Sequence, residues 1–313
     1  MHQSHPAKTY AEAEKRALDL RHHEEGDIRP DSHTRLLTHG AKTKHAIVMF
    51  HGFTNSPAQY TILAQIFFEN GYNVLLPRLQ YHGFIDVLTE DLEKLRASDI
   101  VSLTQESVDI AQGLGENVIV LGLSAGGVMA WWAAQHRSDI SLAVVISPFL
   151  GLAFFPKWFS QTLKTVLPKI PNAFIWWDPR KKEKLPGPAH AYPRVSTHSM
   201  AEILIVGAQL LADAHAHPPQ AKEILLITND FDAAIHVKTA KKLGALWRGH
   251  GANLRTHNFA REEKHWHDMI DPEQVTQRIG VVYPVLLKLI HRGKMKLSPT
   301  VRTMLAQKSA TQI

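Results

Sequence analysis

Apolar positions along the chain form short continuous runs, and between these runs they recur with helical spacing. The run at 46–50 is of the kind buried on both faces of a parallel sheet, and further strands are predicted at 73–76, 118–121, 142–146, 223–228 and 253–259. The stretches with helical spacing cover residues 57–70, 99–114, 125–136, 200–215, 237–248 and 272–290. This alternation predicts an α/β fold with a mostly parallel central sheet flanked by helices.

Three regions depart from this alternation within the single domain that we expect over residues 1–313. At the start, a helical pattern over 7–25 is followed by one short strand at 35–38. Residues 148–199 are rich in proline and aromatic residues and show no clear strand, which indicates a cap insertion over the sheet. Residues 291–313 are basic and partly apolar, and we favour a frayed or loosely docked terminus over a segment held on a membrane surface.

The composition bounds the class of protein. The chain has 313 residues, of which 44% are hydrophobic and 20% charged, so it can bury a large core. It has no cysteine, which excludes disulfides, thiolate zinc sites and a catalytic cysteine. Neither a signal peptide nor a run near the roughly 18 apolar residues of a membrane span is present, so we expect a cytoplasmic protein without stable membrane insertion. The net charge of +6 is scattered and no nucleic-acid motif accompanies it.

The sequence GLSAGG, residues 122–127, lies between a predicted buried strand and a predicted helix. A G-x-S-x-G turn in that setting strains the backbone of its serine, and Gly122 and Gly126 avoid Cβ atoms that would collide with the strand and the helix. The N-terminal amides and dipole of the helix point at negative charge that develops beside the serine. Ser124 is therefore a candidate nucleophile, although a tight turn alone also favours a small residue.

A second motif, FHGFTNSP at residues 50–57, directly follows the first long strand. A serine hydrolase needs two backbone N–H groups aimed at the oxyanion, one after the nucleophile and one in an early strand-ending loop. Ala125 and Phe53 occupy these two positions. A strand-ending turn with a satisfied histidine would account for His51 and Gly52, but not for the pairing of this motif with Ser124.

Together, four stretches resemble the α/β-hydrolase superfamily, in the branch of esterases, monoacylglycerol lipases and serine-aminopeptidase-like (S33-type) hydrolases. They are HGFTNSP, GLSAGG, GYNVLLPRLQYHG at 71–83 and HDMIDP at 267–272, and the resemblance extends over about 46–290. It implies an α/β-hydrolase fold and a triad in the chain order nucleophile, acid, histidine. Related sequences usually have Pro-Gly before the His-Gly of the second stretch. Gln80 and Tyr81 replace that pair, which bears on the shape of the pocket.

The triad acid implied by this resemblance follows the strand at 223–228, in the loop NDFDAAIHV. The loop offers Asp230 and Asp232. An acid in this family commonly lies three residues before an apolar residue that re-enters the fold, and the spacing of Asp232 to Ile235 fits. Asp230 is the alternative, unless it caps the loop or the next helix.

The triad histidine is expected on the loop before the last helix, where KHWHDMIDP offers two candidates. The HDMIDP match favours His267 and leaves His265 as the alternative. In this mechanism neutral His267 takes the proton of Ser124, while Asp232 holds the tautomer and stabilises the imidazolium.

Two H-x-H pairs, His215 with His217 and His265 with His267, also allow a metal interpretation. Residues two apart on a helix face different directions, so the first pair is a poor chelate. No H-E-x-x-H motif is present. We therefore expect no metal and no cofactor.

The aromatic residues of the insertion bear on the substrate. Most should pack against the sheet, and two or three should line an apolar acyl pocket. We select Phe155, Trp158 and Tyr81 as substrate-binding residues. The acids Asp178 and Glu183 lie among basic residues, which argues against a site for the free amino terminus of a peptide. The sequence thus predicts a serine carboxylesterase that hydrolyses small apolar acyl esters through an acyl-enzyme. A thioesterase, lipase or amidase with the same triad and a non-catalytic binding module are the alternatives.

Overall fold

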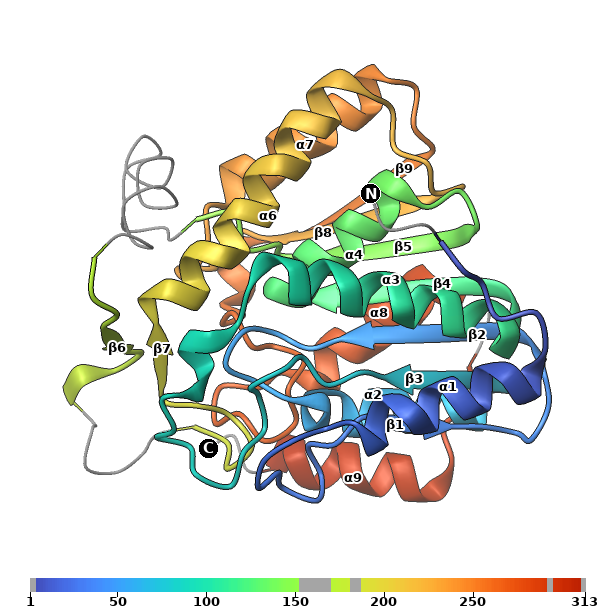
Figure 1. The fold of residues 1–313 in the computed structure, drawn as a ribbon, viewed down its shortest axis with the longest axis horizontal. Helices are drawn as coiled ribbons and strands as arrows, with labels where there is room; N and C mark the ends of the chain where they lie inside the picture. Colours follow the sequence, from blue (N-terminus) through green and yellow to red (C-terminus); the bar gives the residue numbers. More distant parts are fainter. Residues whose placement is uncertain (1–3, 152–169, 181–186, 292–294, 311–313) are drawn as a thin grey trace.

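The computed structural model describes residues 4–151, 170–180, 187–291 and 295–310. Its central strands are β1 (Arg35–Leu37), β2 (Thr43–Phe50), β3 (Tyr72–Leu76), β4 (Gly115–Leu123), β5 (Ile140–Ile146), β8 (Ile224–Asn229) and β9 (Leu254–Phe259). They form a seven-stranded sheet in the order β1-β3-β2-β4-β5-β8-β9 (Figure 1). Every neighbouring pair is parallel except β1 with β3 at one edge. The prediction of a mostly parallel α/β sheet is confirmed.

The continuous apolar runs of the sequence arise because the inner strands are buried on both faces. In β2, Ala46, Val48 and Phe50 pack into the core on one face, whereas Ile47 and Met49 pack into the core on the other. Successive side chains of a strand point to opposite faces, so a strand between two layers of helices needs apolar residues at every position.

Helices cover both faces of the sheet (Figure 1). One core cluster includes residues of α1 (Tyr10–His22), α3 (Ala97–Leu114), α4 (Ala125–His136), α6 (Thr197–Ala216) and α7 (Val237–Gly249). The other includes residues of α2 (Thr61–Glu69), α8 (Ile279–His291) and α9 (Pro299–Ala310). Short 3-10 segments are η1 (Pro57–Tyr60), η2 (Asp91–Lys94) and η5 (Arg261–Glu263). Within the described ranges, no helix is long and apolar enough to cross a membrane.

The start of α8 and the strand pair β6 and β7 differ from the sequence prediction. The last predicted helix begins near residue 272, whereas α8 begins at Ile279, because Asp271 and the residues after it form turns and the side chain of Gln277 accepts a hydrogen bond from the Ile279 amide. In the segment between β5 and α6, where no strand is predicted, β6 (Phe174–Trp176) and β7 (Arg194–Ser196) form an antiparallel pair. Each has three residues, which is too short for alternation to be recognised. The expected insertion at 148–199 includes residues 152–169 and 181–186, which lie outside the described ranges.

Much of the basic C-terminal segment is helical, whereas the sequence favours a frayed or loosely docked end. Val301 of α9 is fully buried in the core cluster shared with α2 and α8. The Ser298 hydroxyl accepts a hydrogen bond from the Val301 amide at 3.2 Å and donates one to Glu69 at 3.0 Å. Asn70 hydrogen-bonds both the amide and the carbonyl of Lys296. A cap and a buried apolar residue thus hold this helix against α2 and α8.

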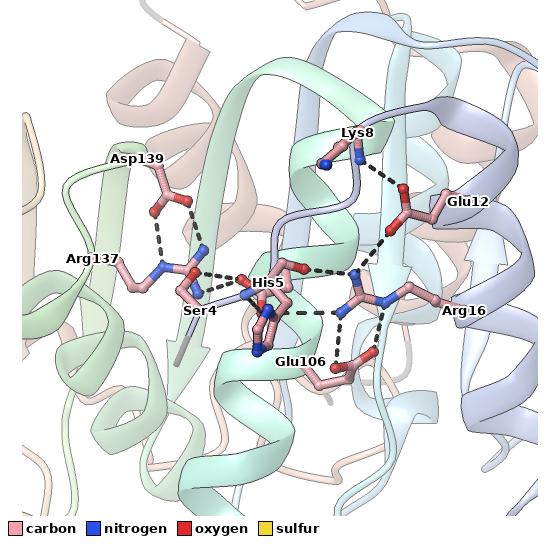
Figure 2. Close-up of polar contacts among 9 residues, drawn as sticks. Ser4, His5, Lys8, Glu12, Arg16, Glu106, Arg137 and Asp139 are labelled. Carbon is pink, nitrogen blue, oxygen red and sulfur yellow. Dashed lines mark hydrogen bonds and ion pairs between the residues drawn. The ribbon is translucent and has the colours of Figure 1, made fainter. Parts of the chain in front are cut away.

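At the other end of the chain, the segment before α1 lies against α3, where His5 approaches Arg16 and Arg16 binds Glu106 (Figure 2). Asp109 of α3 accepts hydrogen bonds from the Ser4 hydroxyl at 2.9 Å and from the His5 amide at 2.8 Å. Arg137, just after α4, places Nη1 2.7 Å from Asp109, and Arg16 of α1 donates to the His5 carbonyl. These bonds connect α1, α3 and α4 on one face of the sheet.

Candidate active site

The residues selected from the sequence lie on loops that leave the carboxyl ends of neighbouring parallel strands. Phe53 follows β2, Ser124 follows β4, Asp232 follows β8 and His267 follows β9. These four strands and β5 are contiguous and parallel in the sheet. Because the carboxyl ends of parallel strands share one edge, the four loops meet on the same side of the molecule, where α/β proteins place their ligands.

Ser124 occupies a strained turn between β4 and α4. Its backbone has φ 61° and ψ −115°, a conformation that side chains other than glycine rarely adopt, and the residue is buried. A Cβ on Gly122 would lie 1.9 Å from the carbonyl oxygen of Gly126, and a Cβ on Gly126 would lie 1.9 Å from that of Phe50. The strand and the helix approach too closely for any side chain at these positions, as the G-x-S-x-G pattern predicts.

Asp232 and His267 form a hydrogen-bonded pair. The His267 Nδ1 lies 2.7 Å from Asp232 Oδ2, and the other carboxylate oxygen accepts the amide of Ala234 at 2.9 Å. A carboxylate oxygen can only accept a hydrogen bond, so the Nδ1–H of His267 is the donor. The Nε2 of the neutral His267 ring can then accept a proton. The Asp232 side chain is fully buried and that of His267 is 17% exposed. The structure records no hydrogen bond between His267 and the Ser124 hydroxyl, a contact that often tightens only when substrate binds.

The electrostatics of this pair favour its charged form. Burial lowers the pKa of His267, but the charge of Asp232 and the hydrogen bond to it outweigh burial and raise that pKa to about 9. Burial raises the pKa of Asp232, yet the charge of His267 and the hydrogen bond hold that pKa below its ordinary value. The neutral imidazole that a general base requires therefore forms as the pH rises toward 9.

The two alternative residues have different surroundings. Asp230 lies 2.6 Å from the Lys241 ammonium and accepts a hydrogen bond from Asn258, and the bond to Lys241 lowers the pKa of Asp230. His265 is buried with neither ring nitrogen hydrogen-bonded, 3.8 Å from Glu263 at the surface, and burial lowers its pKa. Asp230 and His265 thus do not form an acid–histidine pair.

The metal interpretation finds no support in the arrangement of side chains. Over the parts of the chain that the structure describes, no group of three or more His, Asp or Glu residues could hold a metal ion. His215 lies in the last turn of α6 and His217 is the residue that ends this helix. His267 is directed to Asp232, whereas the ring of His265 packs edge-on against Phe259.

The backbone amides of Ala125 and Phe53 are the two that the sequence assigns to the oxyanion hole. Ala125 is the first residue of α4, where helical N–H groups have no intrahelical partner, and Phe53 lies in the turn after β2. No described residue accepts a hydrogen bond from either amide. His51 at the start of this turn is a structural residue. Its Nε2 accepts the Leu79 amide at 3.0 Å, its Nδ1–H donates to the Gly52 carbonyl at 2.9 Å, and burial lowers its pKa to about 4.

Of the three residues selected for substrate binding, the structure describes only Tyr81. It is half-buried and has φ 63°, a conformation that suits the glycine usual at this position in related sequences. Its carbonyl accepts a hydrogen bond from the Tyr192 hydroxyl at 3.1 Å. Phe155 and Trp158 lie outside the described residues, so all three assignments stay predictions.

The sequence reasoning missed a buried polar cluster beside these loops. Asp271 is fully buried and accepts hydrogen bonds from Asn55 at 2.9 Å and from His190 at 3.0 Å. Asp271 belongs to the matched stretch HDMIDP, which was the only available signal. Its partners lie 216 and 81 residues away along the chain, where no local pattern identifies them.

Comparison with known proteins identifies the family to which this chain is similar. The sequence profile of a family described as serine aminopeptidase, S33 matches residues 41–268. A thermostable monoacylglycerol lipase of Bacillus sp. (strain H-257) is 34% identical over 101 residues, which is 32% of this chain and 39% of the length of that lipase.

Solved structures share the fold at low sequence identity. One, from work on the metagenome-derived lipolytic enzymes LipS and LipT, has a TM-score of 0.62 and 20% identity, and the match covers 85% of this chain and 100% of that one. The monoacylglycerol lipase of Paleococcus ferrophilus has a TM-score of 0.56 and 16% identity, with 87% and 98% covered.

Proposed function

We propose that this chain, which belongs to the serine aminopeptidase S33 family of α/β hydrolases, cleaves carboxylic esters with Ser124 as its nucleophile. The observation that carries the proposal is the buried Asp232–His267 hydrogen bond of 2.7 Å. It lies on the sheet edge that also bears the strained serine turn. A serine hydroxyl is a weak nucleophile, and a base oriented by a carboxylate is the usual means of activating it.

In this mechanism the Ser124 oxygen attacks the ester carbonyl while Nε2 of His267 takes the hydroxyl proton. The carbonyl oxygen becomes an oxyanion, which the amides of Phe53 and Ala125 stabilise by hydrogen bonding. The tetrahedral intermediate collapses, the C–O bond to the alcohol breaks, and His267 returns the proton to the leaving oxygen. Water then attacks the acyl-enzyme with His267 as base, and the carboxylic acid and free serine are formed.

An ester of an apolar acyl group is the substrate that fits best. The curated relative is a monoacylglycerol lipase, and the segment between β5 and α6 is rich in aromatic residues. An aminopeptidase would need an unpaired acid near the site to bind the free amino terminus of its peptide substrate. Asp178 in that segment lies 3.2 Å from the Arg180 guanidinium. We therefore favour small acyl esters, including monoacylglycerols, over peptides.

The proposal is tested by incubating the protein with a fluorophosphonate and locating the adduct by peptide mass spectrometry, alongside p-nitrophenyl butyrate hydrolysis. We expect labelling at Ser124 that abolishes turnover. Ser124→Ala should lower kcat by about 10⁴-fold or more while the protein stays folded, because serine, histidine and acid act as a unit.

Rates on a monoacylglycerol, a thioester and an anilide of matched acyl length then assign the bond that is cleaved. A Ser124→Ala protein that keeps more than about a tenth of the wild-type rate would exclude this nucleophile, given the cost expected of its loss. A folded wild-type protein that is neither labelled nor active would favour a binding module on a hydrolase scaffold.

A further inference from the structure

Asp271 connects three segments that are far apart in the sequence. Its Oδ2 accepts hydrogen bonds from the Asn55 side-chain amide at 2.9 Å and from Nε2 of His190 at 3.0 Å. Its Oδ1 accepts the backbone amide of Glu273 at 3.0 Å. Asn55 belongs to the turn after β2, His190 to the segment between β5 and α6, and Asp271 follows His267 by four residues. All three side chains of the cluster are buried, so water competes little for these bonds.

The Asn55 side chain can face Asp271 in only one orientation. Its carbonyl oxygen accepts the Ser56 amide at 2.8 Å, which leaves the NH₂ group for the carboxylate. The Asn55 backbone amide donates to the Gly52 carbonyl at 3.1 Å and closes a tight turn. Phe53 and Thr54 are the central residues of that turn, and Thr54 has φ 63°. The direction of the Phe53 amide is therefore set by where Asn55 is held.

The segment between β5 and α6 holds the same turn at two further points. The Tyr192 amide donates to the Thr54 carbonyl at 2.7 Å, and the Trp177 indole donates to the Thr54 hydroxyl at 3.1 Å. The Tyr192 hydroxyl in turn accepts the Phe84 amide at 3.0 Å. His190, two residues before Tyr192, adds the bond to Asp271.

We propose that Asp271 is a positioning residue for the oxyanion hole, acting through Asn55 and supported by His190; this inference rests on the proposed function. Oxyanion donors must lie about 2.7–3.1 Å from the position that the charged oxygen takes. Hydrogen bonds to a carboxylate are stronger than neutral ones and fix geometry better. Release of Asn55 lets the Phe53 amide turn away from that position. Such a displacement weakens binding of the transition state and leaves binding of the neutral ester unchanged.

The test compares Asn55→Ala and Asp271→Asn with wild type, with Asp230→Asn as the control from a neighbouring loop. An asparagine at 271 must turn its NH₂ group toward either the Glu273 amide or the Asn55 and His190 donors, so one side of the cluster loses its acceptor. The hydrogen bonds that remain also lose the charge that strengthens them. Loss of an oxyanion donor costs about 10²–10³ in kcat, and for a displaced donor we expect a loss of about tenfold or more. KM for p-nitrophenyl butyrate should change less than about threefold, because ground-state binding is retained. The double variant should lose no more than the worse single variant, since both remove one linkage.

A second measurement separates positioning from stability. A trifluoromethyl ketone forms an oxyanion in the hole when it adds to Ser124, so its affinity should fall by the same factor as kcat/KM. His190→Ala should share the loss, and His190→Gln, whose amide can still donate to Asp271, should recover most of it. A purely structural cluster would lower the unfolding temperature and leave the kcat of folded protein unchanged.

The outcomes also separate this inference from the proposed function. Asn55→Ala and Asp271→Asn proteins that are folded and turn over within twofold of wild type would overturn the positioning role alone. A wild-type protein that a fluorophosphonate does not label at Ser124 would overturn the proposed function, and the positioning role with it.

Discussion

The charge of Asp232 should control the pH at which the protein becomes active. In the proposed mechanism the neutral form of His267 is the base, and the pKa of His267 is raised to about 9. The rate constant kcat/KM should therefore rise with pH and level off above pH 9, because deprotonation of His267 generates the active form. Asp232→Asn removes the charge but keeps the shape of the side chain. Burial, which lowers the pKa of His267, then acts without the charge that opposes it.

The magnitude follows from the two pKa values. The difference between about 9 and the ordinary 6.5 corresponds to about 3 kcal/mol in favour of the imidazolium. About 1% of the imidazole is neutral at pH 7 and about half at pH 9, so kcat/KM of the wild type should rise about fifty-fold between these values. In Asp232→Asn the midpoint should fall below 6.5. Its plateau should be about 10⁴-fold lower, because an asparagine amide facing Nδ1 selects the wrong tautomer.

The assay is hydrolysis of p-nitrophenyl butyrate from pH 5 to 10, corrected for the uncatalysed rate at each pH. Nuclear magnetic resonance titration of the His267 imidazole in the Ser124→Ala background measures the same pKa without turnover. Asp230→Asn is the matched control, because Asp230 lies in the same loop and is paired with Lys241 instead. A wild-type midpoint near 6.5, or an Asp232→Asn midpoint still near 9, would refute the reasoning.

Two further predictions concern the framework of the site. Gly126→Ala places a Cβ 1.9 Å from a backbone oxygen of β2 and should destabilise the protein by more than about 3 kcal/mol, measured by urea unfolding. Gly249→Ala, in α7, would meet no atom within 4 Å and should leave the urea midpoint unchanged or raise it slightly. Asp109→Asn should cost about 1–3 kcal/mol, because Arg137 keeps its pair with Asp139 but loses the second carboxylate at 2.7 Å, and an amide cannot accept all the hydrogen bonds that Asp109 accepts. The exposed Asp91→Asn control should have no measurable effect, and equal midpoints for both aspartate variants would contradict this account.

The inner strands of the sheet could be predicted because burial on both faces requires a continuous apolar run in the sequence. A strand such as β2 is covered on both faces, so its apolar run is continuous and stands out. The strand pair β6 and β7 could not be predicted, since three-residue strands have no measurable period. The start of α8 was also misplaced. Pro272 suits a helix start, but α8 begins seven residues later, at Ile279, where the side chain of Gln277 accepts a hydrogen bond from the Ile279 amide.

The candidate site also has a part that the sequence predicts and a part that it does not. Ser124 and His267 lie in motifs that are contiguous in the sequence, and the spacing to Ile235 favours Asp232 over Asp230. The orientation of these residues depends instead on contacts between distant segments. Asp271 has partners 216 and 81 residues away, and each is an isolated polar residue without a period. A motif therefore identifies candidates for the reacting groups, whereas their contacts with distant segments are identified only from the folded chain. The Asn55 and Asp271 variants test whether those contacts contribute to the rate.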